Sequence, residues 1–173
     1  MSTRDVGLTE SRSSGGTGFA GAGAETVTTE AVRKTVLVDF APAEAFELFT
    51  TRIASWWPVG THSYGGDAVK DVVLEHRVGG RLYEVTEAGE QDWGRVLEWD
   101  PPHRFLLDWQ IGDARGTEVE VRFSPEGPGA RVELEHRGFS APDPRDRYTD
   151  GWDVVLTPYV EKAKRSHSRP APV

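Results

Sequence analysis

The side chains best suited to proton transfer in this sequence are its histidines. There are five of them: His62, His76, His103, His136 and His167. No two have the spacing that places a metal pair on one helix face or one strand, and there is no cysteine, so we expect no metal site and no thiolate or disulfide chemistry. The motifs of zinc hydrolases, serine hydrolases and phosphate-binding loops are also missing from the sequence, so we predict no catalytic residues and no cofactor.

His136 is the histidine whose position indicates most clearly that it faces inward. It alternates with Val132 and Leu134, so on a strand all three side chains share one face. An imidazole that meets a cavity could orient a ligand or act as a general base. A wall histidine held by a single partner is the simpler alternative. His62 and Tyr64 follow the segment WWP in a polar loop, where we expect the mouth of a pocket.

Charged residues on neighbouring predicted strands also bear on a site. Glu75, Glu84 and Arg95 fall there, and Arg95 alternates with Trp93, which predicts that Arg95 lies on an aromatic face. A buried charge without a partner is costly, so such residues should be paired. An Arg95–Glu84 pair would be structural, whereas an unpaired Arg95 would indicate an anionic ligand.

The elements that must position these residues follow a simple order. Residues 27–40 are rich in β-branched side chains and predict a strand, after which Pro42 opens a short helix and residues 51–57 a second helix or turn. From residue 69 the period changes to two, which predicts six strands: 69–77, 81–86, 92–100, 104–111, 117–124 and 130–137. Their short, turn-rich connections favour an antiparallel meander.

A long amphipathic helix closes the chain. Apolar residues recur at helical spacing through 150–163, and Asp143-Pro144 is a suitable start for this helix. The order β-α-α-β6-α predicts an α+β, helix-grip fold, in which a curved antiparallel sheet of six to seven strands wraps around the C-terminal helix.

Such a sheet encloses a space beneath the helix, and an apolar cavity with a few polar groups is the usual form of a small-molecule site. For any single tryptophan, plain core packing is the favoured interpretation. For the aromatic residues as a group, a pocket is the favoured interpretation. The cavity candidates are Trp56, Trp57, His62, Tyr64, Trp93, Arg95, Trp109, His136, Trp152, Leu156 and Tyr159.

Composition limits the domain organisation and the class of partner. Residues 1–25 are rich in Gly and Ser and predict a disordered tail, 26–166 form one domain, and 167–173 are a flexible C-terminal tail. The net charge of −8 argues against binding to nucleic acid. No apolar run approaches the ~18 residues of a membrane span and no secretory signal is evident, so we expect a cytoplasmic protein.

Six segments carry a resemblance to a known family: AFELFTTRIASWWP (45–58), LEHRVGGRLYE (74–84), DWGRVLEWDPPHRFLLDW (92–109), TEVEVRF (117–123), RVELEHRGF (131–139) and GWDVVLTPY (151–159). Together they resemble the START-like (SRPBCC) superfamily over residues 28–165, in the branch similar to the C-terminal domain of the activator of heat-shock protein 90 ATPase. The resemblance implies a helix-grip fold whose internal cavity binds hydrophobic or amphipathic small molecules. The eukaryotic activator carries an additional N-terminal domain in place of the short Gly/Ser tail, which argues against chaperone activation here.

Three functions remain in order of preference. The first is non-catalytic binding of a small hydrophobic or amphipathic ligand in the cavity. The second is an enzyme of the polyketide-cyclase or hydratase kind that uses the same cavity, with His136, His62 or Tyr64 moving protons. The third is a co-chaperone-like module that stimulates an ATPase partner, for which an exposed apolar patch on the outer face of the sheet would be required.

Overall fold

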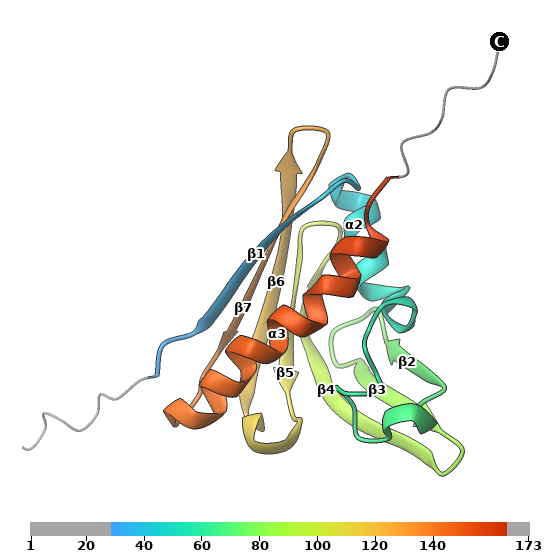
Figure 1. Ribbon diagram of the computed structural model, residues 1–173, viewed down its shortest axis with the longest axis vertical. Coiled ribbons are helices and arrows are strands. Elements are labelled where there is room, and N and C mark those ends of the chain that lie inside the picture. Colours follow the sequence, from blue (N-terminus) through green and yellow to red (C-terminus); the bar gives the residue numbers. More distant parts are fainter. Residues whose placement is uncertain (1–28, 166–173) are drawn as a thin grey trace, which may run out of the picture.

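The computed structural model describes residues 29–165, which form one seven-stranded antiparallel sheet with a long helix laid across it (Figure 1). The predicted tails, 1–25 and 167–173, lie outside these residues. The strands are β1 (Val32–Val38), β2 (Asp71–Leu74), β3 (Arg81–Thr86), β4 (Gly89–Asp100), β5 (Arg104–Trp109), β6 (Thr117–Glu126) and β7 (Gly129–Arg137). Their order in the sheet is β1-β7-β6-β5-β4-β3-β2. The six-strand meander is therefore confirmed, and the first strand joins it beside the last.

Two α-helices and three short 3-10 turns accompany the strands in the described part of the chain. They are α2 (Pro42–Thr50), α3 (Pro142–Lys162), η1 (Ile53–Ser55), η2 (Gly66–Ala68) and η3 (Gly112–Ala114). Helix α3 begins at Pro142 with Ala141 as its N-cap, two residues before the start predicted at Asp143-Pro144. Of the helix or turn predicted for residues 51–57, the structure forms the single turn η1. Within residues 29–165, no helix is both long and apolar enough to cross a membrane.

Helix α3 covers the concave face of the sheet because one side of it is apolar. Trp152, Val155, Leu156 and Tyr159 are all buried on that side. The Tyr159 hydroxyl donates a 2.8 Å hydrogen bond to the carbonyl oxygen of Ala45, which joins α3 to α2. The α+β helix-grip fold predicted from the sequence is thus the observed one (Figure 1).

Closely packed rings fill the space between α2, α3 and the sheet. The Phe49 ring centroid lies 4.9 Å from that of Trp56 and 4.9 Å from that of Tyr159. Phe46 makes an edge contact with Phe123 at 5.1 Å. Edge-to-face pairs of this kind add stability beyond the apolar area they bury. This end of the fold is a solid core.

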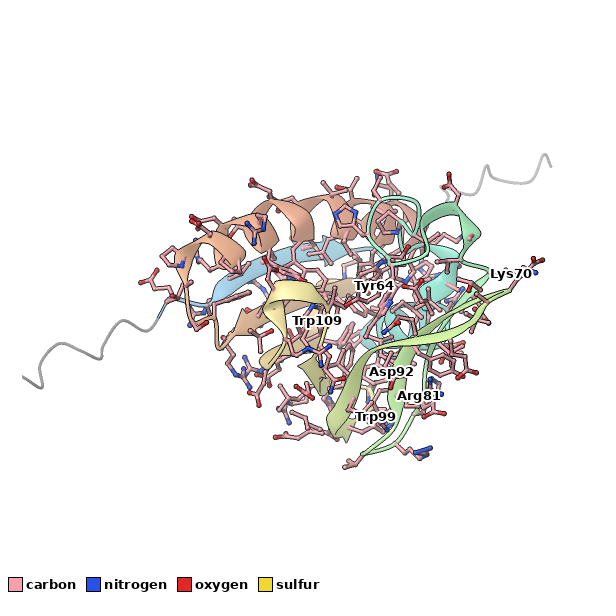
Figure 2. All side chains as sticks on the ribbon, turned by 90° about the horizontal axis from the view of Figure 1, so that it is seen from below. Tyr64, Lys70, Arg81, Asp92, Trp99 and Trp109 are labelled. Atoms are coloured by element: carbon pink, nitrogen blue, oxygen red, sulfur yellow. The ribbon has the colours of Figure 1, made fainter. Side chains whose placement is uncertain are left out.

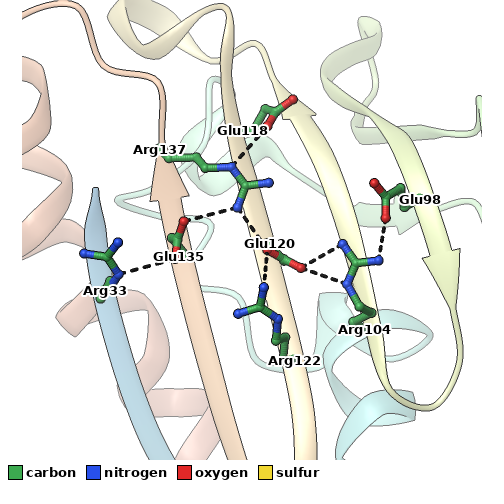
Figure 3. Close-up of polar contacts among 8 residues, drawn as sticks. All are labelled: Arg33, Glu98, Arg104, Glu118, Glu120, Arg122, Glu135 and Arg137. Carbon is green, nitrogen blue, oxygen red and sulfur yellow. Dashed lines mark hydrogen bonds and ion pairs between the residues drawn. The ribbon is translucent and has the colours of Figure 1, made fainter. Parts of the chain in front are cut away.

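The outer face of the sheet carries a network of alternating charges (Figure 3). At its centre is Glu120 on β6, whose side chain is 3% exposed and accepts hydrogen bonds from Arg104 at 2.8 Å, Arg122 at 3.0 Å and Arg137 at 2.9 Å. Burial alone would raise the pKa of Glu120, but the bonds from Arg137 and Arg104 and the nearby positive charges lower it below its usual value. The outward position of Arg and Glu on these strands agrees with the alternation in the sequence.

Two irregularities in β4 change which of its residues face inward. The register shifts between Leu82 and Tyr83 opposite β4, and again between Val96 and Glu98. Each β-bulge adds one unpaired residue and so reverses the alternation beyond it. Trp93 and Val96 are consequently buried, whereas Arg95 is exposed. The prediction that Arg95 shares an inner face with Trp93 is therefore wrong.

Candidate functional site

An apolar pocket lies between the middle of α3, the end of β5 and the loop that follows η1. Its volume is about 300 Å³. Tyr64 on the loop and Trp109 on β5 both lie on the side of the sheet that α3 covers (Figure 2). The lining residues are Trp57, Thr61, His62, Ser63, Tyr64, Trp109, Ile111, Arg147, Tyr148, Gly151, Trp152 and Val155.

Three indole rings form the apolar part of the pocket. The ring centroids of Trp109 and Trp152 are 5.6 Å apart, and that of Trp57 lies 5.9 Å from Trp152 at an interplanar angle of 89°. Each indole N–H is used within the protein: Trp57 donates to the His62 carbonyl at 2.7 Å, Trp109 to the Tyr148 hydroxyl at 3.2 Å and Trp152 to His136 at 3.0 Å. The tryptophans therefore offer ring carbons to a ligand, and not hydrogen bonds.

Glu84 fixes the loop that carries one wall. Its carboxylate, on a residue only 1% exposed, accepts hydrogen bonds from the backbone N–H of Tyr64 at 2.8 Å and of Gly65 at 2.7 Å, and from the Trp93 indole at 2.6 Å. Three donors replace the water that the carboxylate gave up on burial. Glu84 thus pairs with N–H groups, and the Arg95–Glu84 ion pair considered from the sequence does not form.

Polar side chains gather at the rim of the pocket. The Tyr64 hydroxyl oxygen accepts a 2.9 Å hydrogen bond from the backbone N–H of Gly112, which links the loop to η3. The His62 Nδ1 atom lies 2.7 Å from the Thr61 hydroxyl, and its Nε2 atom faces Gly151 on α3. Among the described residues, neither the Tyr64 hydroxyl proton nor His62 Nε2 has a hydrogen-bond partner. Both groups remain able to bind a ligand.

Two residues from the first turns of α3 complete the rim. Arg147 forms an ion pair with Asp113 of η3 that stays largely exposed. The Tyr148 hydroxyl accepts from Trp109, and burial raises the pKa of Tyr148 above its usual value while that hydrogen bond acts in the opposite direction. Tyr148 is therefore a neutral phenol at neutral pH, and Arg147 is the cationic group among the pocket-lining residues.

His136 is fully buried behind the pocket and does not line it. The Trp152 N–H can only donate, so His136 Nδ1 accepts it, and the ring proton sits on Nε2, 2.7 Å from the Thr117 hydroxyl oxygen. The Thr117 proton in turn goes to the carbonyl oxygen of Ala114 at 2.6 Å. Burial lowers the pKa of His136 to about 3. The imidazole is thus a neutral structural bridge, and the expectation that it meets the cavity is wrong.

The structure brings together five of the eleven candidates chosen from the sequence: Trp57, His62, Tyr64, Trp109 and Trp152. The others lie elsewhere. Trp56, Trp93, Leu156 and Tyr159 are buried core residues outside the pocket lining, His136 lies behind the wall, and Arg95 is on the surface beside Asp92. Aromatic residues of the two groups have the same sequence pattern, so periodicity alone could not separate core from wall.

Several pocket residues escaped the sequence interpretation. Arg147 and Tyr148 lie one helical turn before Gly151 and Trp152, and all four line the pocket together with Val155. Gly151 itself was the available signal, because a glycine is unfavourable within a helix and its presence there indicates a packing or functional role. Thr61 and Ser63 come from a loop, for which no periodicity exists, and Ile111, which was predicted to end a strand, lies two residues beyond the end of β5. Residues 29–165 contain no group of three or more His, Cys, Asp or Glu side chains placed to hold a metal ion.

Comparison with solved structures identifies relatives of the same shape. An anthrahydroquino-γ-pyrone synthase complexed with SUM is 35% identical, with a TM-score of 0.50 over 78% of this chain and 97% of that one. The self-sacrificing resistance protein CalC of Micromonospora echinospora is 26% identical, with a TM-score of 0.63 over 78% and 94%. The Aha1 dimer of Colwellia psychrerythraea is 14% identical, with a TM-score of 0.60 over 78% and 96%, and is similar in fold.

Comparison with family models gives one assignment. The model described as activator of Hsp90 ATPase homolog 1-like protein matches residues 39–158, from the end of β1 to the last turns of α3. A comparison with curated protein sequences gives no significant match. The family match spans well over half of the chain, and the solved relatives are similar to it in fold. The chain therefore belongs to the activator of Hsp90 ATPase homolog 1-like family, within the START-like (SRPBCC) superfamily.

Proposed function

We propose that the pocket binds a small, flat aromatic molecule that carries a polar or acidic oxygen. The observation that carries this proposal is the division of the pocket into two parts. Its interior presents the carbon faces of Trp57, Trp109 and Trp152, and its rim presents Tyr64, His62 and Arg147.

The interior favours an aromatic ligand over a polar one. Since all three indole N–H groups are bonded within the protein, a polar group placed among these rings would lose water without replacement. An aromatic ring would instead stack on or meet the indole edges. The volume of about 300 Å³ is at the lower end of the range for ligand sites, roughly 300–1,000 Å³. A compact ring system fits these conditions.

The rim favours an oxygen atom on that ligand. The Tyr64 hydroxyl and His62 Nε2 can form hydrogen bonds, and Arg147 places a positive charge beside them. A guanidinium binds a carboxylate or phenolate well, and a cationic ligand would be repelled by it. Asp113 holds Arg147 at the rim and competes with the ligand for it, so the preference for an anion should be moderate.

Titration with matched naphthyl probes tests the proposal. We expect 2-naphthoate to bind more tightly than 2-naphthylmethylammonium, with quenching of tryptophan fluorescence because three tryptophans line the pocket. The substitution Arg147→Gln should weaken 2-naphthoate by about tenfold, equivalent to about 1.4 kcal/mol. Arg145→Gln is the matched control, since Arg145 lies on the same helix and outside the pocket lining. Failure of both probes, and of neutral 2-naphthol, to bind would contradict the proposal.

A ring-closing enzyme is the second candidate, favoured by one comparison. The relative that is 35% identical is described as an anthrahydroquino-γ-pyrone synthase. His62 could accept a proton from an attacking phenol, and Tyr64 could donate one to the carbonyl oxygen, since both groups face the pocket. Alignment of the reacting atoms by the indole walls would add to the rate.

The enzymatic alternative has a defined assay. A 1-(2-hydroxyaryl)-1,3-diketone closes to a γ-pyrone when the phenol oxygen attacks the distant ketone, with formation of one C–O bond and release of water. Mass spectrometry would follow the appearance of the dehydrated product above the uncatalysed rate. If the protein catalyses the closure, His62→Ala and Tyr64→Phe should each reduce kcat by about 10²-fold or more. Binding of the diketone without turnover would leave the pocket as a binding site only.

A further inference from the structure

Gly151 lies in the interior of α3, where glycine is unfavourable. A glycine in the middle of a helix destabilises it by about 0.5–1 kcal/mol relative to alanine, since its backbone loses more freedom on folding. The helix runs without interruption from Pro142 to Lys162, so Gly151 neither ends it nor caps it. Its backbone is outside the left-handed region that would require glycine.

Packing does not require this glycine either. A Cβ atom built on Gly151 would meet only His62 Nε2, at 3.8 Å, which is ordinary van der Waals contact. Other glycines of the protein are different. A Cβ on Gly94 would lie 2.2 Å from the Asp108 carbonyl oxygen, and one on Gly129 would lie 2.0 Å from that of Val38. Those two positions exclude any side chain, whereas position 151 has room for one.

The room at position 151 belongs to the pocket. Gly151 is a lining residue, one helical turn from Tyr148 and Val155 and next to Trp152, and it faces His62 across the space. Without a side chain, the helix presents its backbone to the pocket as a flat strip between the Trp152 ring and the rim. A methyl group there would protrude into the volume that a ligand would occupy.

We propose that Gly151 is a specificity-determining residue, which admits flat fused-ring ligands by letting a ring lie directly against the backbone of α3. The inference rests on the proposed binding function and adds to it the shape of the ligand and the residue that selects it. A rigid ring cannot move away from an added methyl group, whereas a flexible alkyl chain can bend around it. Glycine at position 151 thus lowers the stability of the helix but leaves its backbone accessible to a ligand in the pocket.

The experiment compares three variants of the full-length protein: Gly151→Ala, Gly151→Leu and Val154→Ala. Val154 is 50% exposed on the same helix and is not a lining residue, so its replacement raises helix propensity without touching the pocket. The probes are 2-anthroate, a rigid tricyclic acid, and decanoate, a flexible acid with the same head group. Thermal unfolding gives Tm, and calorimetric or fluorescence titration gives Kd.

We expect Gly151→Ala to raise Tm by about 2–4 °C, as its better helix propensity requires. The same variant should weaken 2-anthroate by about tenfold or more and change decanoate by less than about threefold. Gly151→Leu should abolish binding of 2-anthroate, and Val154→Ala should leave both affinities unchanged.

Four results would overturn the inference. A lower Tm for Gly151→Ala would show that glycine serves folding. A higher Tm with unchanged affinity for 2-anthroate would show that the position does not select ligands, and the binding function would stand. Wild-type protein that binds the naphthyl probes but not 2-anthroate would show that the bare helix backbone does not admit a larger fused ring, and the binding function would stand. Failure of every probe would refute the proposed function together with the inference.

Discussion

Replacement of His136 by glutamine should remove much of the loss of stability that we expect of the protein between pH 7 and pH 5. The ring of His136 is fully buried, with Nδ1 accepting from Trp152 and Nε2 donating to Thr117. A proton added to Nδ1 would face the Trp152 N–H donor. The folded protein therefore holds this histidine in its neutral form.

The sign of the effect follows from the lowered pKa. Folding lowers the pKa of His136 from 6.5 to about 3. Above pH 6.5 both folded and unfolded chains hold a neutral ring, and the stability is fully present. As the pH falls below 6.5 only the unfolded chain binds the proton, so the free energy of unfolding decreases by up to about 1.4 kcal/mol per pH unit. The decrease ends near pH 3, where the ring of the folded protein also takes up a proton. Between pH 7 and pH 5 the loss from this one group is about 2 kcal/mol.

The His136→Gln variant should lose this pH dependence of stability, but it also loses a buried hydrogen bond at every pH. Glutamine can keep one of the two hydrogen bonds, and the buried partner left alone costs about 1–3 kcal/mol. At pH 7 the variant should therefore be less stable than the wild type, and at pH 5 the difference should have narrowed by about 2 kcal/mol.

Urea unfolding at constant ionic strength, followed by tryptophan fluorescence, measures both quantities. His76→Gln, at an exposed position, controls for the substitution itself. Parallel curves of unfolding free energy against pH for wild type and His136→Gln would refute the reasoning, since they would mean that His136 titrates alike in both states. A variant more stable than wild type at pH 7 would contradict the hydrogen-bond assignment.

Three further substitutions test other contacts. Glu84→Gln places an NH₂ group against a backbone N–H donor of the pocket loop, so the free energy of unfolding should fall by about 1–3 kcal/mol. Amide hydrogen exchange in residues 61–66 should also accelerate. The control substitution Glu87→Gln, at an exposed position, should have neither effect. Glu120→Gln should lower the free energy of unfolding in urea at pH 7 by about 1–3 kcal/mol. The difference from wild type should shrink as the pH falls below the usual carboxyl pKa, because the ionised Glu120, whose pKa is lowered in the folded protein, stabilises less as it is protonated. A difference that widens on acidification would contradict this. Tyr159→Phe should cost about 1 kcal/mol through the lost bond to Ala45 without changing the Kd of 2-naphthoate, and a weaker Kd would mean that Tyr159 belongs to the pocket after all.

The fold could be predicted from the sequence because its signals are local. Alternation along β6 and β7 places Val119, Val121 and Leu134 inside, and the helical spacing of Trp152 and Tyr159 gives the buried face of α3. Short, turn-rich connections leave an antiparallel meander as the simplest arrangement of such strands. These choices depend on neighbours in the chain, and the structure confirms them.

The pocket was only partly predictable, because it depends on where long-range contacts leave space. Trp56 and Trp57 are adjacent in the sequence, yet the first packs into the core against Tyr159 and the second lines the pocket. His136 looks like a cavity residue by alternation, but Trp152 and Thr117, both distant in the chain, occupy its two nitrogens. No period in the sequence records these partners.

The sequence by itself thus determined the element order, the inner and outer faces of the regular strands and the amphipathic helix, since each follows from a repeat of 2 or 3.6 residues. Only the tertiary structure decided that the bulge at Trp93 turns Arg95 to the surface, that Glu84 holds the pocket loop by its backbone, and that Gly151 leaves part of the α3 surface without a side chain. A bulge, a buried carboxylate and an empty volume all arise from the meeting of segments far apart in the chain, and such meetings are fixed by packing.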